Sequence, residues 1–342
     1  MNNIEVVGLG ALNIDHICQV ERILDDGETV VNEAKSFPGG SAANTIYGLA
    51  RLGVNTGFTG VVGDDAEGKI MLQDFHKVGV DTSQIRVKPG AKTGSTVCLS
   101  DRFGKRSLYV LPGVNNLLTI DDLDLAYINQ AKMLHVSSFV DDRQFKILLG
   151  LVDRLDLPTK VSFTPGALYA VKGLRALTPI LNRTHVLFVN QSELHQLTGE
   201  GIKAGAESCL KHGCRTIAVT FGQGSRLELG KGISRRTVSA VSYIRDAESE
   251  YAVELGGQNT VSEVDTTGAG DAFATGFIYG LLNGKGLEVC GRLGNIVAQF
   301  SIAKLGAREG LPTSNDLAQR HQELYGQQQG YERFSGEIQE AR

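Results

Sequence analysis

The stretch VDTTGAGDAFATGFIYGLL, residues 264–282, predicts a β-rich approach, a glycine turn and then an apolar helix. Gly268 and Gly270 allow the backbone to come close to a ligand, and the free N–H groups at a helix start form an anion site. Asp271 falls in the first helical turn, where the helix dipole favours its ionised form. Such a carboxylate can take the proton of an alcohol while the N–H groups neutralise charge on a transferred phosphoryl group.

The spacing by itself leaves two interpretations open. The first is a phosphate site with Asp271 as a general base. The second is a glycine-rich turn followed by an ordinary acidic residue at a helix start. The chain has no GxxxxGK[ST] loop, and GLG at residues 8–10 lacks the third glycine of a dinucleotide fingerprint. A Walker-type phosphate loop is therefore excluded, and a dinucleotide oxidoreductase is disfavoured.

Short apolar runs alternate with helical patterns through most of the chain. Buried strands are predicted at residues 4–10, 58–62, 133–136, 161–163, 186–189 and 217–219. Apolar residues recur at helical spacing between them, as at 42–50, 71–78 and 148–155. This alternation predicts an α/β fold with a doubly wound, mostly parallel sheet flanked by helices. Ligands of such sheets bind at the carboxyl ends of the strands.

Two stretches, residues 12–38 and 92–112, interrupt the alternation. Both show strand and turn patterns where a strand should lead directly into a helix. They predict a small inserted β-sheet that acts as a lid over the main sheet, with a pair of surface hairpins as the alternative. If strands of two lids pair between chains, a homodimer follows, because exposed strand edges need cover.

The composition is that of a globular protein. The 342 residues are 42% hydrophobic and 21% charged, and the net charge of −4 gives no reason to expect a nucleic-acid partner. No apolar run approaches the roughly 18 residues of a membrane helix, and the N-terminus lacks signal-peptide features. Five cysteines without a CxxC pair predict reduced thiols and a cytoplasmic protein.

The chain resembles the ribokinase-like (PfkB-type) carbohydrate and nucleoside kinases. Two signatures carry the resemblance, GGSAANTIYGLARLG at residues 39–53 and DTTGAGDAFATGF at residues 265–277. They stand in the family's order and more than 200 residues apart, which makes the match specific. The resemblance covers residues 1–313, the expected kinase domain, and leaves 314–342 as a helical and polar C-terminal extension.

The resemblance implies an ATP-dependent kinase that uses Mg²⁺ with its nucleotide. Asp271 matches the family's catalytic base, and Gly268, Ala269 and Gly270 match its anion hole. Five further positions match the residues that contact the sugar: Asn13, Asp15, Gly39, Gly40 and Asn44. Glycines let hydroxyl groups reach the backbone, and carboxylate and amide groups satisfy their donors and acceptors.

Other family positions concern the nucleotide. NQSE at residues 190–193 matches an Asn-x-x-Glu motif that in the family helps organise magnesium and phosphate. The resemblance implies that Glu193 acts on Mg²⁺ through water. A helix-capping pair is the alternative. The positions that match nucleotide contacts are Asn190, Thr220, Gly222, Gly224 and Asn295.

Relatives often hold a monovalent cation beside the anion hole. The positions that match this site are Asp265, Thr267, Ser301 and Gly306. Potassium there would add positive potential near the phosphates. Gly310 stands where some relatives have a hydroxyl side chain, so dependence on K⁺ is a hypothesis.

The acceptor is open between a sugar and a nucleoside. YVLPGVNNLLT at residues 109–119 resembles the ribokinase branch, whereas GGSAANT lacks the Lys of GGKGAN and shares features with adenosine-kinase-type sequences. SSFVDD at residues 137–142 stands where ribokinases usually supply a Glu to the sugar. The expected reaction is phosphorylation of a sugar hydroxymethyl group. The alternatives are a nucleoside kinase of the same fold and a catalytically silent binding module.

Overall fold

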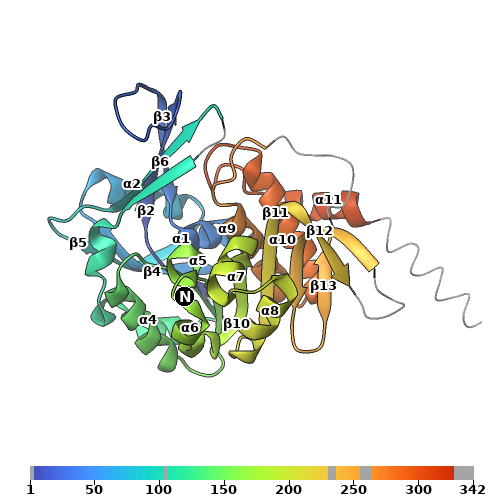
Figure 1. Cartoon of the computed structure of the whole chain (residues 1–342). Helices are drawn as coiled ribbons and strands as arrows, with labels where there is room; N and C mark the ends of the chain where they lie inside the picture. Colours follow the sequence, from blue (N-terminus) through green and yellow to red (C-terminus); the bar gives the residue numbers. More distant parts are fainter. Residues whose placement is uncertain (1–3, 104–105, 230–235, 255–262, 327–342) are drawn as a thin grey trace, which may run out of the picture.

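The computed structural model describes residues 4–103, 106–229, 236–254 and 263–326. Within these residues the centre is a nine-stranded sheet in the order β13-β12-β11-β10-β9-β8-β1-β4-β5 (Figure 1). Its strands are β1 (Val6–Leu9), β4 (Thr56–Gly63), β5 (Asp81–Lys88), β8 (Met133–Ser137), β9 (Lys160–Thr164), β10 (Thr184–Asn190), β11 (Thr216–Leu229), β12 (Arg236–Arg245) and β13 (Glu250–Val253). Neighbours from β11 to β5 are parallel, and β11–β12 and β12–β13 are antiparallel. The predicted mostly parallel sheet is confirmed.

Helices cover both faces of this sheet. One layer holds α3 (Leu125–Asn129), α4 (Asp142–Asp153), α5 (Gly166–Ala170), α6 (Gly173–Leu181), α7 (Gln191–Thr198) and α8 (Ile202–Lys211). The other holds α1 (Ser41–Arg51), α2 (Ala66–Lys77), α9 (Ala269–Leu282), α10 (Leu287–Ile302) and α11 (Ser314–Tyr325). Two short 3-10 helices, η1 (Gly113–Leu117) and η2 (Ile120–Asp122), precede α3.

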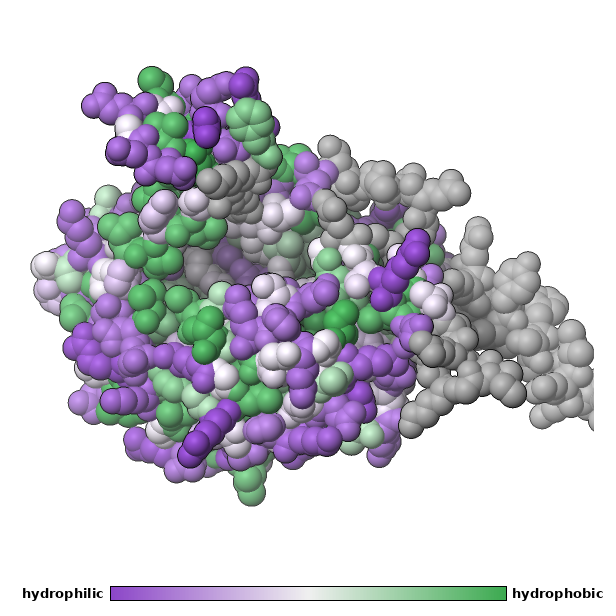
Figure 2. Space-filling view, in the orientation of Figure 1, coloured by the Kyte–Doolittle hydropathy of each residue, from purple (hydrophilic) through white to green (hydrophobic). Residues whose placement is uncertain are grey.

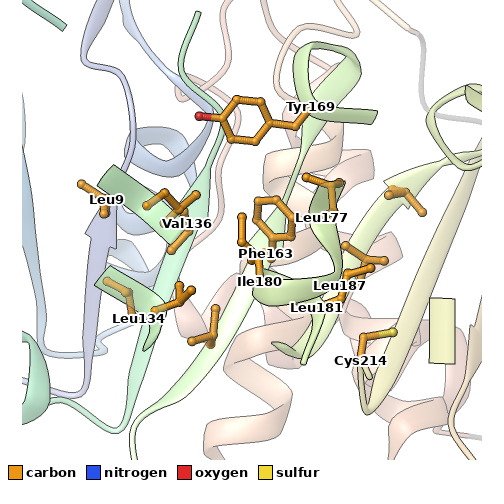
Figure 3. Close-up of a cluster of buried hydrophobic side chains, with 14 of the residues drawn as sticks. Leu9, Leu134, Val136, Phe163, Tyr169, Leu177, Ile180, Leu181, Leu187 and Cys214 are labelled. Carbon is orange, nitrogen blue, oxygen red and sulfur yellow. The ribbon is translucent and has the colours of Figure 1, made fainter. Parts of the chain in front are cut away.

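The apolar runs of the sequence are strands buried on both sides. In β10, Leu187 and Val189 belong to one core, while Val186 and Phe188 belong to the core on the opposite face, because successive side chains alternate between faces. Figure 3 shows part of the first core, where side chains of neighbouring strands gather around Phe163.

The two segments that interrupt the alternation join in one small sheet. Its strands are β2 (Asn13–Val20), β3 (Val31–Gly39), β6 (Gly94–Asp101) and β7 (Arg106–Leu111), in the order β3-β2-β6-β7. The parallel pairing of β2 with β6 links the two insertions, so they are not independent hairpins. The sheet stands out from the body as a separate lobe, called the lid below (Figure 2).

The structure differs from two local predictions, on either side of the proposed nucleotide cavity. Residues 263–266, directly before the glycine turn, are not a strand, and β11 runs on past residue 219 to Leu229.

The predicted C-terminal extension starts with α11, which buries Leu317 and Tyr325 in the core it shares with α10. The polar tail from residue 327 onward lies outside the described residues. None of the five cysteines forms a disulfide bond in the described structure. Among the described helices, none is both long and apolar enough to span a membrane.

Candidate active site

The glycine turn begins α9 through a left-handed residue. Gly268 has φ 75° and ψ 4° and is the N-cap of the helix. A Cβ at this position would lie 2.5 Å from the Cβ of Ala307, so the close approach requires glycine. The Ala269 N–H donates to the Thr266 carbonyl at 3.2 Å. The next N–H groups, of Gly270 and Asp271, belong to the first turn, which has no intrahelical acceptor to offer them.

Asp271 is held by the start of α1. Its Oδ1 accepts a hydrogen bond of 2.6 Å from the Ser41 hydroxyl, and its Oδ2 accepts one of 2.9 Å from Asn44 Nδ2. The Asp271 carbonyl accepts from the hydroxyls of Thr45 and Thr275 at 3.3 and 2.9 Å. The second glycine signature of the sequence is thereby joined to the first, with Ser41 as a partner that sequence reasoning did not single out.

Burial dominates the electrostatics of this carboxyl. It raises the pKa of Asp271 to about 6, against the opposing effect of the hydrogen bonds from Ser41 and Asn44. The negative charges of Asp15 and Glu193 add to the rise. The sequence predicts a carboxylate stabilised by the helix dipole. Burial outweighs such stabilisation here, yet a group with this pKa is still mainly ionised at neutral pH and suits general-base catalysis.

Asp15 and Gly39 meet at the base of the lid. A Cβ on Gly39 would lie 2.1 Å from Asp15 Oδ2, so the carboxylate rests directly on the glycine backbone. Burial raises the pKa of Asp15 to about 6, while a hydrogen bond from Thr96 and the charge of Arg308 act in the opposite direction. Gly40 follows with φ 95° and its Cβ position lies 2.2 Å from the Ala11 carbonyl oxygen.

Asn13 is buried and held by Asn115, which sequence reasoning did not assign a role. Asn115 Nδ2 donates to Asn13 Oδ1 at 2.9 Å and to the Leu12 carbonyl at 3.1 Å, and Asn115 Oδ1 accepts from the Leu12 N–H. Asn115 belongs to the stretch 109–119, whose likeness to ribokinases was the available signal. After Ser41 and Asn115, Arg308 is the third unassigned residue, with a buried guanidinium that bonds to Asn44 and to the Gly39 carbonyl.

Asn190 and Glu193 form the capping box that their spacing also predicts. Asn190 Oδ1 accepts from the Glu193 N–H at 2.8 Å, and Glu193 Oε2 accepts from the Asn190 N–H at 2.9 Å. Burial raises the pKa of Glu193. Among the described residues no three His, Cys, Asp or Glu side chains gather as a metal cage. In proteins Mg²⁺ is usually held by one or two carboxylates together with substrate phosphates rather than by a cage of side chains.

A cavity of about 240 Å³ opens beside the glycine turn. Thr220, Gly222 and Asn295 line it together with Ala269 and Gly270. Apolar walls come from Val241, Phe273, Ala298 and Ile302. Three of the expected nucleotide positions thus share one cavity with two residues of the expected anion hole. Gly224 lies where the pairing of β11 with β12 is interrupted, and it does not line this cavity.

Of the residues expected at a cation site, Asp265, Thr267 and Gly306 lie in loops, and Ser301 lies in the last turn of α10. Asp265 Oδ1 accepts from the Thr267 N–H and hydroxyl at 2.9 and 2.7 Å, and its Oδ2 accepts from the Gly306 N–H at 3.0 Å. The Asp265 N–H also reaches the carbonyl of Ile302, the residue after Ser301. The buried Ser301 hydroxyl has no hydrogen-bond partner among the described residues.

Comparisons with known proteins agree with this architecture. The model of the pfkB family of carbohydrate kinases matches residues 3–314. An uncharacterized sugar kinase of Archaeoglobus fulgidus is 38% identical over 272 residues, which are 79% of this chain and all of the relative. An ATP-dependent ribose-1-phosphate kinase of Halopiger xanaduensis is 29% identical over 92% of this chain and 97% of its own length. The crystal structure of a Methanocaldococcus jannaschii nucleoside kinase, described as an archaeal member of the ribokinase family, superimposes with a TM-score of 0.76 at 22% identity, covering 94% of this chain and all of that one.

The chain therefore belongs to the pfkB family of carbohydrate kinases. It is an ATP-dependent kinase of the ribokinase-like class of sugar and nucleoside kinases.

Proposed function

We propose that the enzyme transfers the γ-phosphoryl group of ATP to a hydroxymethyl group of a sugar, with Asp271 as the general base. The observation that carries the proposal is the position of the Asp271 carboxylate. It follows directly on the Gly268–Gly270 turn and is fixed by two donors from α1. The negative charge of Asp15 helps to raise the pKa of Asp271, which supports a site shared by the proposed sugar-binding carboxylate and the proposed base.

The acceptor would lie between the lid base and the start of α1. Asp15 supplies acceptors for sugar hydroxyls, and Asn13 and Asn44 supply amide groups. Gly39 and Gly40 allow the Asp15 carboxylate and the Ala11 carbonyl oxygen to lie directly against their backbone, which fixes Asp15 beside the proposed acceptor site. Closure of the lid over this region would exclude water that otherwise hydrolyses ATP.

In the transfer step, Asp271 takes the proton of the attacking hydroxyl group. The N–H groups of the Gly268–Gly270 turn stabilise the charge on the phosphoryl group in transit. The cavity lined by Thr220, Gly222 and Asn295 is the proposed place of the nucleotide base and ribose, and Asn190 is proposed on its phosphate side. Mg²⁺ would supply charge neutralisation on the phosphates, with Glu193 acting on it through water.

A potassium ion beside the anion hole is a further part of the proposal. The supporting observation is the buried Ser301 hydroxyl, which has no partner among the described residues, close to the Asp265 loop. Asp265, Thr267, Ser301 and Gly306 would surround the ion, whose charge would strengthen the anion hole.

We also propose a homodimer through the lid. β7 is an outer strand of the lid sheet, and Leu108, Tyr109, Val110 and Leu111 are 59%, 57%, 42% and 51% exposed. Since consecutive residues of a strand point to opposite faces, both faces of β7 present apolar side chains to solvent. A second lid would cover this apolar edge.

The test measures ADP release from ATP and Mg²⁺ by wild type and Asp271→Asn. The acceptors are ribose, ribose 1-phosphate, fructose, 2-keto-3-deoxygluconate, several nucleosides and fructose phosphates. Turnover with a sugar that is lost in the variant supports the proposal. Turnover only with a nucleoside supports the nucleoside-kinase alternative. Binding of an acceptor by thermal shift without any turnover would indicate a silent binding module.

A further inference from the structure

Arg308 follows α10 and carries a guanidinium that is almost fully buried, with 4% of the residue exposed. Its Nε donates to Asn44 Oδ1 at 2.9 Å, one terminal nitrogen donates to Asp74 Oδ2 at 2.7 Å, and the other donates to the Gly39 carbonyl at 3.0 Å. These three acceptors belong to α1, to α2 and to the last residue of β3. A single planar group therefore ties the lid base to two helices.

The first contact determines how the Asn44 amide is oriented. An amide has an acceptor oxygen on one side and a donor NH₂ group on the other. Because Arg308 is a donor only, it requires the oxygen of Asn44 on its own side. The NH₂ group must then face Asp271, where it donates to Oδ2. If the Asn44 amide were flipped, its NH₂ group would face the N–H of Arg308 and its oxygen would face the carboxylate of Asp271, and neither hydrogen bond could form.

The third contact, from Arg308 to the Gly39 carbonyl, lies on the side of the site where the phosphoryl acceptor is proposed to bind. The Gly39 carbonyl that Arg308 holds belongs to the residue on which the Asp15 carboxylate rests. The Arg308 charge also lowers the pKa of Asp15. The guanidinium thus touches the neighbours of both carboxylates, although no hydrogen bond links it directly to Asp15 or Asp271 in the described structure.

The buried charge of Arg308 is balanced by an ion pair. A buried cation is costly unless it is paired, and Asp74 provides the pair. The rings of Tyr47 and Phe75, 5.1 and 5.3 Å from the Arg308 Cζ, add cation–π contacts. The bonds to Asn44 and Gly39 go beyond this pairing, because they lead from the ion pair into the site.

We propose that Arg308 is a positioning residue of this kinase, which orients the Asn44 amide toward Asp271 and holds the Gly39 backbone beneath Asp15. The inference rests on the proposed role of Asp271 as the base. Its rival is an ion pair with Asp74 that contributes only to stability.

The experiment compares Arg308→Lys with Asp74→Asn. Lysine keeps the charge but cannot serve three acceptors with one rigid fork. Asn at position 74 keeps an oxygen acceptor for Arg308 and removes only the ionic partner. A second variant, Arg308→Met combined with Asp74→Leu, removes both charges together, which buried sites tolerate better than loss of one partner.

The first readout is the ¹³C chemical shift of the Asp271 carboxyl, titrated with pH and assigned through its absence in Asp271→Asn. We expect the midpoint in Arg308→Lys to rise by about 1 pH unit, because a carboxylate that loses a stabilising donor is harder to ionise. The midpoint should also rise in the double variant Arg308→Met, Asp74→Leu. In Asp74→Asn it should stay within about 0.3 pH unit of the wild-type midpoint. An unchanged midpoint in both Arg308 variants overturns the proposal.

The second readout is kcat. Arg308→Lys should lower kcat by about 10- to 100-fold with little change in KM for ATP, whereas Asp74→Asn should lower Tm and keep kcat within about 3-fold. In an Asn44→Ala background the loss caused by Arg308→Lys should shrink to less than about 3-fold, since both changes break the same link. An equal loss in both backgrounds refutes action through Asn44. If wild type itself lacks phosphotransfer, the proposed function fails, and the carboxyl titration still decides the role of Arg308.

Discussion

Gly39→Ala tests whether the Asp15 carboxylate serves the acceptor. The new Cβ would lie 2.1 Å from Asp15 Oδ2, whereas ordinary contact begins near 3.4 Å. The carboxylate must therefore retreat by the difference, about 1.3 Å. Asp15 is the end of a side chain rather than backbone, so the change should cost no more than about 1–3 kcal/mol of folding free energy.

The functional cost should be larger than the structural one. A displacement of about 1 Å at a positioning group is worth about 10²-fold in rate, so kcat/KM for the acceptor should fall by about that factor. KM for ATP should stay near the wild-type value, because the proposed nucleotide cavity is lined by residues of β11, β12, α9, α10 and the loop before α9, and not by Gly39. Initial rates with varied acceptor and varied ATP separate the two effects, and thermal unfolding reports stability.

The matched control is Gly150→Ala, which makes the same chemical change in α4. A Cβ there meets nothing within 4 Å. The substitution should leave kcat/KM unchanged and stabilise the protein by about 1 kcal/mol through helix propensity. If Gly39→Ala keeps wild-type kcat/KM within about 3-fold while remaining folded, Asp15 does not contact the acceptor in the way proposed.

Four further outcomes follow from the site. Asp271→Asn should lower kcat by about 10²- to 10⁴-fold with nearly intact ATP binding, and turnover equal to wild type would remove the base assignment. Because burial raises the pKa of Asp271 to about 6, kcat should fall as the pH drops through 6 and the base becomes protonated, and a profile flat down to pH 4.5 would contradict this. Replacing K⁺ with tetramethylammonium should lower kcat, whereas an unchanged rate would exclude the cation site. Light scattering at micromolar concentration should give a dimer for wild type and a monomer for Tyr109→Lys in β7, and a monomeric wild type would exclude the lid interface.

Secondary structure could be predicted from the sequence wherever a local residue pattern is enough to define a strand or a turn. The apolar runs marked the central strands, since strands buried on both faces need apolar side chains throughout. The glycine turn before α9 was also readable, because Gly268 is required by both its φ and its contact with Ala307. The course of β11 beyond residue 219 was not, since Gly222 and Gly224 are typical of a turn that ends a strand.

The hydrogen-bond partners of the site residues could not be predicted from local sequence patterns. Ser41 and Asn44 bond to Asp271 across more than 220 residues of sequence, and Asn115 reaches Asn13 across 102. Arg308 joins Asn44 from 264 residues away. No local periodicity encodes such pairs, because they depend on how α1, α9 and the lid base pack in space.

The sequence by itself determined the class of fold and the two glycine signatures, because backbone turns and strand burial impose residue types locally. It also singled out Asp15 and Asp271, the carboxylates proposed to carry the chemistry. Only the tertiary structure decided the pKa and the orientation of those carboxylates. Burial, which raises the pKa of Asp15 and Asp271 to about 6, is a property of the packed molecule. The orientation of the Asn44 amide likewise exists only once Arg308 and Asp271 lie on its two sides.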